Sequence, residues 1–145
     1  MNAEAVMTIP LDLTSLASAI DRLAEALDAI HAEPENLLYR DATIQRFEFT
    51  YEIAHKMLRR YLAQAAANPE EIHEMAFADL IRAGNAQGLL QGDWPRWREF
   101  RQARGTTSHT YDEAKAKQVL ILIPDFLAEA RGLLLALQAR TVATP

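Results

Sequence analysis

The sequence predicts an all-α fold, a single up-and-down bundle of about five helices. Three observations carry this prediction. Apolar residues recur at intervals of three and four along most of the 145-residue chain, which places them on one face of a helix. No segment has a convincing strand pattern. The connections are short, which favours antiparallel neighbours. We expect one domain over residues 1–145, with flexible ends at 1–11 and 141–145.

The first two helices have the clearest apolar stripes. The first is expected from Asp12 to Glu33, and the second and longest from Leu38 to Ala66. Asp12 or a nearby hydroxyl residue can cap the first helix, and Pro34 marks the turn between the two. The stripe positions are Leu13, Leu16, Ile20, Leu23, Leu27 and Ile30 in the first helix, and Ile44, Phe47, Tyr51, Ala54, Leu58 and Tyr61 in the second.

Turn residues delimit the two helices that follow. Asn68 and Pro69 form a helix start with proline at the first position, so a third helix is expected from Glu70 to Ala83. Its apolar positions are Ile72, Met75, Ala76, Leu80 and Ile81. Residues 88–92 have the glycines of a loop. A fourth helix then begins at Asp93-Trp94-Pro95 and ends near Arg104 or Gly105.

The fifth helix is expected to begin between Thr110 and Asp112. Thr110 followed three residues later by Glu113 has the pattern of a capping box. Pro124 lies inside the apolar run that follows. Because proline removes a backbone donor and clashes with the preceding turn, we expect it to kink this last helix or break it in two.

Composition excludes several classes of function. The net charge of −5 excludes wholesale basic attraction to nucleic acid, although it allows a local basic patch. Without cysteine the chain forms no disulfide or thiolate metal site, and the cytoplasm is the expected compartment. We identify no signal peptide, and no apolar run is long enough to cross a membrane.

Metal and cofactor motifs are also missing. His73-Glu74 begins a zincin-like HExxH pattern, but Phe77 stands where the second histidine would be. No glycine-rich phosphate loop or nucleophile elbow is present. We therefore predict no metal and no cofactor.

The stretch RGTTSHTY, residues 104–111, holds an unusual concentration of functional groups for one short connection. Arg104 ends one expected helix and His109 precedes the next, so a tight turn brings the two together. The following helix also offers unpaired N–H groups that suit an anion. Arg101 shares a helix face with Arg104 and adds positive charge.

This set of groups suits the cleavage of RNA. An imidazole can accept or donate a proton near neutral pH, and a guanidinium can bind a phosphate and stabilise negative charge. RNA supplies its own nucleophile in the ribose 2′-hydroxyl, so no metal is needed, and DNA would be spared.

A purely structural interpretation competes with this one. Arg104 could interact with the carboxyl end of its helix, and Thr106, Thr107 and Ser108 could make turn hydrogen bonds. His109 could pair with Asp112. The Arg-x4-His spacing taken alone favours this interpretation, because it arises often by chance.

Two longer segments resemble a known family. RDATIQRFEFTYEIAHKMLRRYL, residues 40–62, and RGTTSHTYDE, residues 104–113, are similar to the HEPN domains that pair with minimal nucleotidyltransferases. These are the HepT-like toxins, also named nucleotidyltransferase substrate-binding proteins. The resemblance runs from about Leu38 to the last helix. The second segment matches the family pattern Arg-x4-His-x-Tyr at Arg104, His109 and Tyr111.

The resemblance implies a homodimer with the Arg-His loops at its two-fold interface. It implies a metal-independent endoribonuclease that is the toxin of a toxin–antitoxin module. Arg104 would bind the scissile phosphate and His109 would be the acid–base residue. A cognate minimal nucleotidyltransferase would silence the toxin by converting Tyr111 to O-AMP-tyrosine. We assign substrate-binding support to Arg101, Thr107 and Ser108.

Two departures from the family leave alternatives open. Gly105 stands where many relatives have a polar residue, commonly asparagine. His55 stands where they often have an aromatic residue such as tryptophan, which we interpret as a packing variation without a functional role. Gly105 strengthens the alternative of a non-catalytic subunit that binds a nucleotide or substrate for a two-component nucleotidyltransferase. A third alternative is a plain helical interaction domain. Three aromatic residues near the loop are candidates for an interface or, more commonly, for the core: Trp94, Trp97 and Phe100.

Overall fold

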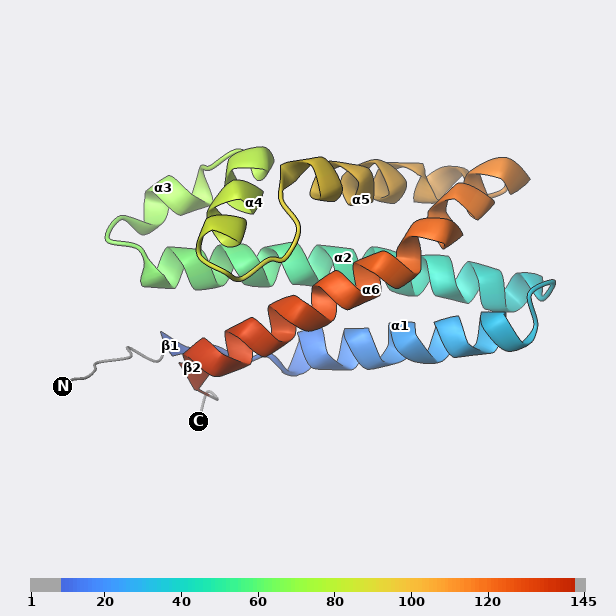
Figure 1. Ribbon diagram of the computed structural model, residues 1–145, viewed down its shortest axis with the longest axis horizontal. Helices are drawn as coiled ribbons and strands as arrows, with labels where there is room; N and C mark the ends of the chain where they lie inside the picture. Colours follow the sequence, from blue (N-terminus) through green and yellow to red (C-terminus); the bar gives the residue numbers. More distant parts are fainter. Residues whose placement is uncertain (1–8, 143–145) are drawn as a thin grey trace.

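The computed structural model describes residues 9–142, which form a helical bundle (Figure 1). The all-α prediction is confirmed, with six α-helices and one short 3-10 helix in this range. They are α1 (Thr14–Ala32), α2 (Leu37–Ala65), α3 (Pro69–His73), α4 (Phe77–Ala86), α5 (Trp94–Thr106), the 3-10 helix η2 (Thr107–His109) and α6 (Glu113–Arg140). No helix within this range is long and apolar enough to cross a bilayer.

An antiparallel hairpin of α1 and α2 forms one side of the bundle (Figure 1). Asn36 caps α2, because its side-chain oxygen accepts a hydrogen bond from the N–H of Tyr39 at 3.0 Å. Two buried threonines on α2 face α1. The hydroxyl of Thr43 donates to the carbonyl of Ala26 at 3.3 Å, and the hydroxyl of Thr50 donates to the carbonyl of Ala19 at 3.2 Å. These contacts help to set the register of the hairpin.

The aromatic part of the core lies where α2, α5 and α6 meet. Phe126 of α6 is fully buried, and its ring centroid lies 5.1 Å from that of Phe47 on α2 and 5.3 Å from that of Phe100 on α5. Trp97 completes the group at 5.4 Å from Phe100. The prediction of Trp97 and Phe100 as core residues is therefore confirmed, while Trp94 is half-buried at its edge.

The predicted third helix is wrong, because the chain forms two helices there. α3 ends at His73 and α4 begins at Phe77. The guanidinium of Arg59 on α2 donates to the carbonyl of Ile72 at 2.8 Å and to that of Met75 at 2.9 Å. These bonds satisfy carbonyl groups that the break in the helix leaves free. Ala76 is exposed in the break, whereas the apolar pattern predicted its burial.

The last helix runs without a break through Pro124, so the prediction that it divides in two is wrong. Pro124 lies on the solvent-exposed side of α6, between Ile123 and Phe126, which are both fully buried. Packing of these two side chains holds the helix together on either side of the proline. A kink at Pro124 stays a prediction.

Parts of the two chain ends lie side by side, which the sequence did not predict. β1 (Ile9–Pro10) pairs in parallel with β2 (Thr141–Val142), and the N–H of Leu11 donates to the carbonyl of Val142 at 3.0 Å. Leu11 is buried in the core. The rest of the expected flexible ends, residues 1–8 and 143–145, lies outside the described residues.

Candidate functional site

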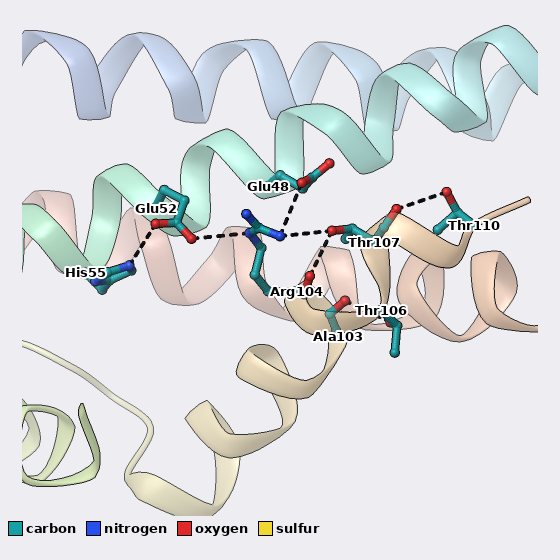
Figure 2. Close-up of polar contacts among 8 residues, drawn as sticks. All are labelled: Glu48, Glu52, His55, Ala103, Arg104, Thr106, Thr107 and Thr110. Carbon is teal, nitrogen blue, oxygen red and sulfur yellow. Dashed lines mark hydrogen bonds and ion pairs between the residues drawn. The ribbon is translucent and has the colours of Figure 1, made fainter. Parts of the chain in front are cut away.

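The connection between α5 and α6 is built from hydroxyl groups that bind the backbone. The hydroxyls of Thr106, Thr107 and Thr110 each donate to the carbonyl three residues earlier, at 2.9, 2.8 and 3.2 Å (Figure 2). These bonds satisfy carbonyls at the end of α5 and continue the chain into η2. The structural role proposed for the threonines is present, and α5 ends at Thr106, one or two residues later than predicted.

Asp112 begins the last helix. Its carboxylate accepts from the N–H of Ala114 at 3.0 Å and from that of Lys115 at 3.4 Å. The predicted capping box on Thr110 is therefore wrong, because Asp112 is the N-cap of α6 and the hydroxyl of Thr110 donates to the carbonyl of Thr107. The side chain of Asp112 binds its own helix and makes no hydrogen bond with the imidazole of His109 in the described part of the chain.

The side chain of Arg104 lies between α2 and Thr107 of the connection. Its Nε lies 3.2 Å from Oε1 of Glu52, and its Nη1 lies 3.2 Å from Oε2 of Glu48 (Figure 2). Nη1 also donates to the hydroxyl of Thr107 at 3.2 Å. The side chain is 33% exposed, so part of the guanidinium remains accessible to an anion from solvent.

A half-buried histidine extends this network along α2. The second carboxylate oxygen of Glu52 lies 3.2 Å from Nε2 of His55, whose ring packs against Tyr51 and Phe77. Burial lowers the pKa of His55, although Glu52 acts in the opposite direction. Its Nδ1 is buried and has no hydrogen-bond partner among the residues that the structure describes. Burial also raises the pKa of the neighbouring Tyr51 to about 12.

His109 and Tyr111 lie on the surface beside each other. His109 ends η2 and is exposed, and Tyr111 is 86% exposed. Their ring centroids are 6.2 Å apart at an interplanar angle of 74°. Within residues 9–142 we find no hydrogen bond or ion pair that joins Arg104 to His109. The connection thus carries an exposed imidazole and an exposed phenol, while the arginine that precedes them in the chain is held by carboxylates.

The three predicted supporting residues have different environments. Thr107 is buried and holds Arg104. Ser108 is exposed. Arg101 is exposed on the surface of α5, with its guanidinium carbon 5.1 Å from the ring centroid of Phe77, a distance at which a cation is attracted to an aromatic face.

Glu48 and Glu52 also belong to the site, and no motif in the sequence indicates them. Their spacing of four places them on the same side of α2. This spacing indicates a site for an arginine only when the helix that faces them is known. As for metals, the described residues hold no group of three or more acidic or histidine side chains that could bind an ion.

Known proteins resemble this chain over most of its length. Residues 11–139 match the family described as nucleotidyltransferase substrate binding protein like. A Haemophilus influenzae protein named "Probable ribonuclease HepT" is 44% identical over 97 residues, which is 67% of this chain. The match spans 66% of that relative's length.

Two solved structures have the same fold. One, from Haemophilus influenzae, is described as the fold of a substrate binding domain of a nucleotidyltransferase. It is 35% identical with a TM-score of 0.81 and covers 88% of this chain and 99% of its own. The other, from Thermus thermophilus, is 28% identical with a TM-score of 0.69. It covers 85% of this chain and 98% of its own. The family match and these two folds agree, and the chain belongs to the nucleotidyltransferase substrate binding protein family.

Proposed function

We propose that this protein is a cytoplasmic, homodimeric and metal-independent endoribonuclease, the toxin of a toxin–antitoxin module. The observation that carries the proposal is the α5–α6 connection, in which Arg104, His109 and Tyr111 follow one another within eight residues. The name of the Haemophilus influenzae relative, a ribonuclease, supports the same activity.

The proposed chemistry uses side chains from the end of α5 and from the connection that follows it. The exposed imidazole of His109 takes the proton from a ribose 2′-hydroxyl, whose oxygen then attacks the adjacent phosphorus. The P–O5′ bond breaks, the imidazolium of His109 returns the proton to the leaving 5′-oxygen, and a 2′,3′-cyclic phosphate forms. The guanidinium of Arg104 stabilises the negative charge that develops on the phosphate oxygens. Arg101, Thr107 and Ser108 support the bound strand.

The exposed phenol of Tyr111 provides a route to silencing. We propose that a cognate minimal nucleotidyltransferase transfers AMP from ATP to this oxygen and releases pyrophosphate. The 86% exposure of Tyr111 leaves it accessible to an enzyme. The added phosphate lies two residues from His109, where its negative charge opposes the approach of an RNA backbone. The family name and the described Haemophilus influenzae fold support association with a nucleotidyltransferase.

One observation favours a second candidate function, a non-catalytic subunit that binds a nucleotide or another substrate for the nucleotidyltransferase. Arg104 is already neutralised by Glu48 and Glu52, and Gly105 offers no side chain to orient a substrate. In this alternative the protein binds but does not cleave.

RNA cleavage in the presence of a chelator distinguishes the two functions. We expect the purified protein to cleave RNA in EDTA and to release 2′,3′-cyclic phosphate ends. His109→Ala should reduce the rate by about 10²-fold or more, the usual contribution of an acid–base residue. His31→Ala is the matched control, because His31 is an exposed histidine on α1. A need for a divalent metal, or full activity in His109→Ala, would contradict the proposed mechanism.

Mass spectrometry after incubation with the cognate nucleotidyltransferase and ATP tests the modification. We expect the mass to increase by one or more AMP units in the natural protein and not in Tyr111→Phe. Tyr39→Phe is the control, because Tyr39 is also partly exposed. Addition of AMP to Tyr111→Phe would place the acceptor elsewhere.

A further inference from the structure

The two carboxylates that hold Arg104 differ in how they are themselves held. Glu52 uses both of its oxygens, one for Nε of Arg104 and the other for His55, each at 3.2 Å. Glu48 contacts Nη1 of Arg104 at 3.2 Å and has no other ion pair or side-chain hydrogen bond within residues 9–142. Both side chains are partly accessible, at 30% for Glu48 and 37% for Glu52. Glu52 is therefore anchored, while Glu48 is held by one contact.

The contacts of the guanidinium also differ along its edges. Glu52 occupies Nε, the edge that faces along α2 toward His55 (Figure 2). Glu48 and the hydroxyl of Thr107 share Nη1. A phosphodiester presents two anionic oxygens to a guanidinium much as a carboxylate does. The Glu48 carboxylate thus occupies a position in which a phosphate oxygen could bind.

The balance of charge around Arg104 also indicates that a phosphate must replace a carboxylate there. One guanidinium faces two carboxylates, so this part of the site carries one excess negative charge. A phosphate that approaches Arg104 adds to that excess and is repelled while both carboxylates remain in place. Removal of the Glu48 carboxylate restores a balanced pair and frees one N–H group of Nη1, while the other still donates to Thr107.

We propose that Glu48 is an internal substitute for the RNA phosphate, which must displace it from Arg104, and that Glu52 is a positioning residue for the guanidinium. This inference rests on the proposed function, because it assumes that Arg104 binds the phosphate of RNA. The anchored Glu52 keeps Nε oriented while Glu48 exchanges with substrate. The contact between Glu48 and Arg104 therefore reduces the affinity of the free protein for RNA.

Two matched substitutions, which should change different kinetic parameters, test this inference. Binding is measured by fluorescence anisotropy with a 2′-O-methyl RNA, which cannot be cleaved, and turnover is measured with ordinary RNA. Glu48→Gln should bind the probe about fivefold more tightly and lower KM, because a single partly exposed ion pair contributes up to about that factor. Glu52→Gln should lower kcat with little change in KM, because it misaligns Arg104 without freeing Nη1.

Glu25→Gln is the control for charge. It removes the same unit of charge and also breaks an ion pair, the 2.8 Å contact between Glu25 and Arg46, on the far side of the α1–α2 hairpin. Its binding should change less than twofold, as expected for a screened, distant charge. Glu48→Ala is the second variant, and its thermal unfolding is compared with that of Glu48→Gln so that an affinity change is assigned only to folded protein.

The outcomes separate this inference from the proposed function. Equal affinity in Glu48→Gln, Glu48→Ala and Glu25→Gln would overturn the displacement of Glu48. A lower kcat in Glu48→Gln together with an unchanged kcat in Glu52→Gln would overturn the assigned roles. Arg104→Ala tests the underlying assumption separately. If it leaves probe binding and RNA cleavage unchanged, the proposed function itself is wrong, whatever the effect at Glu48.

Discussion

At His55, burial and a neighbouring carboxylate act on one imidazole in opposite directions. The ring lies between Tyr51 and Phe77, and the loss of hydration outweighs the attraction of Glu52, so the pKa of His55 is lowered. Lys56 and Arg59 lower it further. The sequence suggested a packing variation at this position, and the aromatic contacts agree with that interpretation. The hydrogen bond to Glu52 also connects His55 to the site.

The lowered pKa of His55 predicts a loss of stability in mild acid. The unfolded chain takes up a proton near the ordinary pKa of 6.5, whereas the folded protein does so only at lower pH. The unfolded state therefore binds more protons in this window, and stability falls as the pH drops below 6.5. Urea unfolding at pH 7.5 and 5.5 should show a smaller loss in His55→Phe than in the natural protein. An equal loss in both would mean that His55 does not contribute.

The packing around two helical glycines, Gly84 and Gly105, determines whether a larger side chain would fit at each position. A Cβ added at Gly105, near the end of α5, would meet no atom within 4 Å. A Cβ added at Gly84 in α4 would lie 3.0 Å from a methyl carbon of Leu90 and 3.2 Å from one of Leu58. Both leucines are buried. Gly84 therefore permits the close approach of α4 to α2, while Gly105 has no such role.

The same substitution should have opposite effects at these two glycines. Gly105→Ala should stabilise the protein by up to about 0.5–1 kcal/mol, because glycine costs helix stability where no packing requires it. Gly84→Ala should destabilise it by about 1–3 kcal/mol, because the added methyl group overpacks buried leucines. Thermal and urea unfolding of the two variants measure the difference. Stabilisation by Gly84→Ala would show that Leu58 and Leu90 move at little cost.

On the scale of the whole molecule, one buried carboxylate joins three parts of the bundle. Glu129 on α6 is 6% exposed and accepts from the N–H of Gly92 and from the indole of Trp97, both at 3.1 Å. It ties the loop before α5 and the first turn of α5 to α6. The sequence did not identify it, because a single Glu in an apolar segment has no partner that can be seen along the chain.

Glu129→Ala should therefore be strongly destabilising. It leaves two buried donors without an acceptor and opens a cavity, and we expect a loss of about 3 kcal/mol or more. Asp125→Ala on the same helix is the control, because Asp125 is exposed and its ion pair with Arg96 should contribute at most about 1 kcal/mol. Urea unfolding followed by tryptophan fluorescence measures both. A small loss in Glu129→Ala would indicate that water replaces the carboxylate.

Local signals predicted α1, α2 and the connection of the site well. The predicted ranges 12–33 and 38–66 lie within two residues of Thr14–Ala32 and Leu37–Ala65. These helix bounds depend on the apolar period and on turn residues, which influence the backbone only a few positions away. The third helix and the break at Pro124 were wrong. In both places a contact between distant parts of the chain outweighed the local helix preference. Between α3 and α4 this contact is made by Arg59 with backbone carbonyls, and around Pro124 it is the burial of Ile123 and Phe126 in the core.

By itself the sequence determined that the chain is helical, where its long helices lie, and that Arg104, His109 and Tyr111 share one short connection. Those properties depend on spacing along the chain. Only the tertiary structure decided that Arg104 turns toward Glu48 and Glu52, while His109 and Tyr111 face solvent. The reason is physical: a guanidinium takes its partners from whichever helix packs beside it, and these carboxylates are 52 and more positions away in the chain.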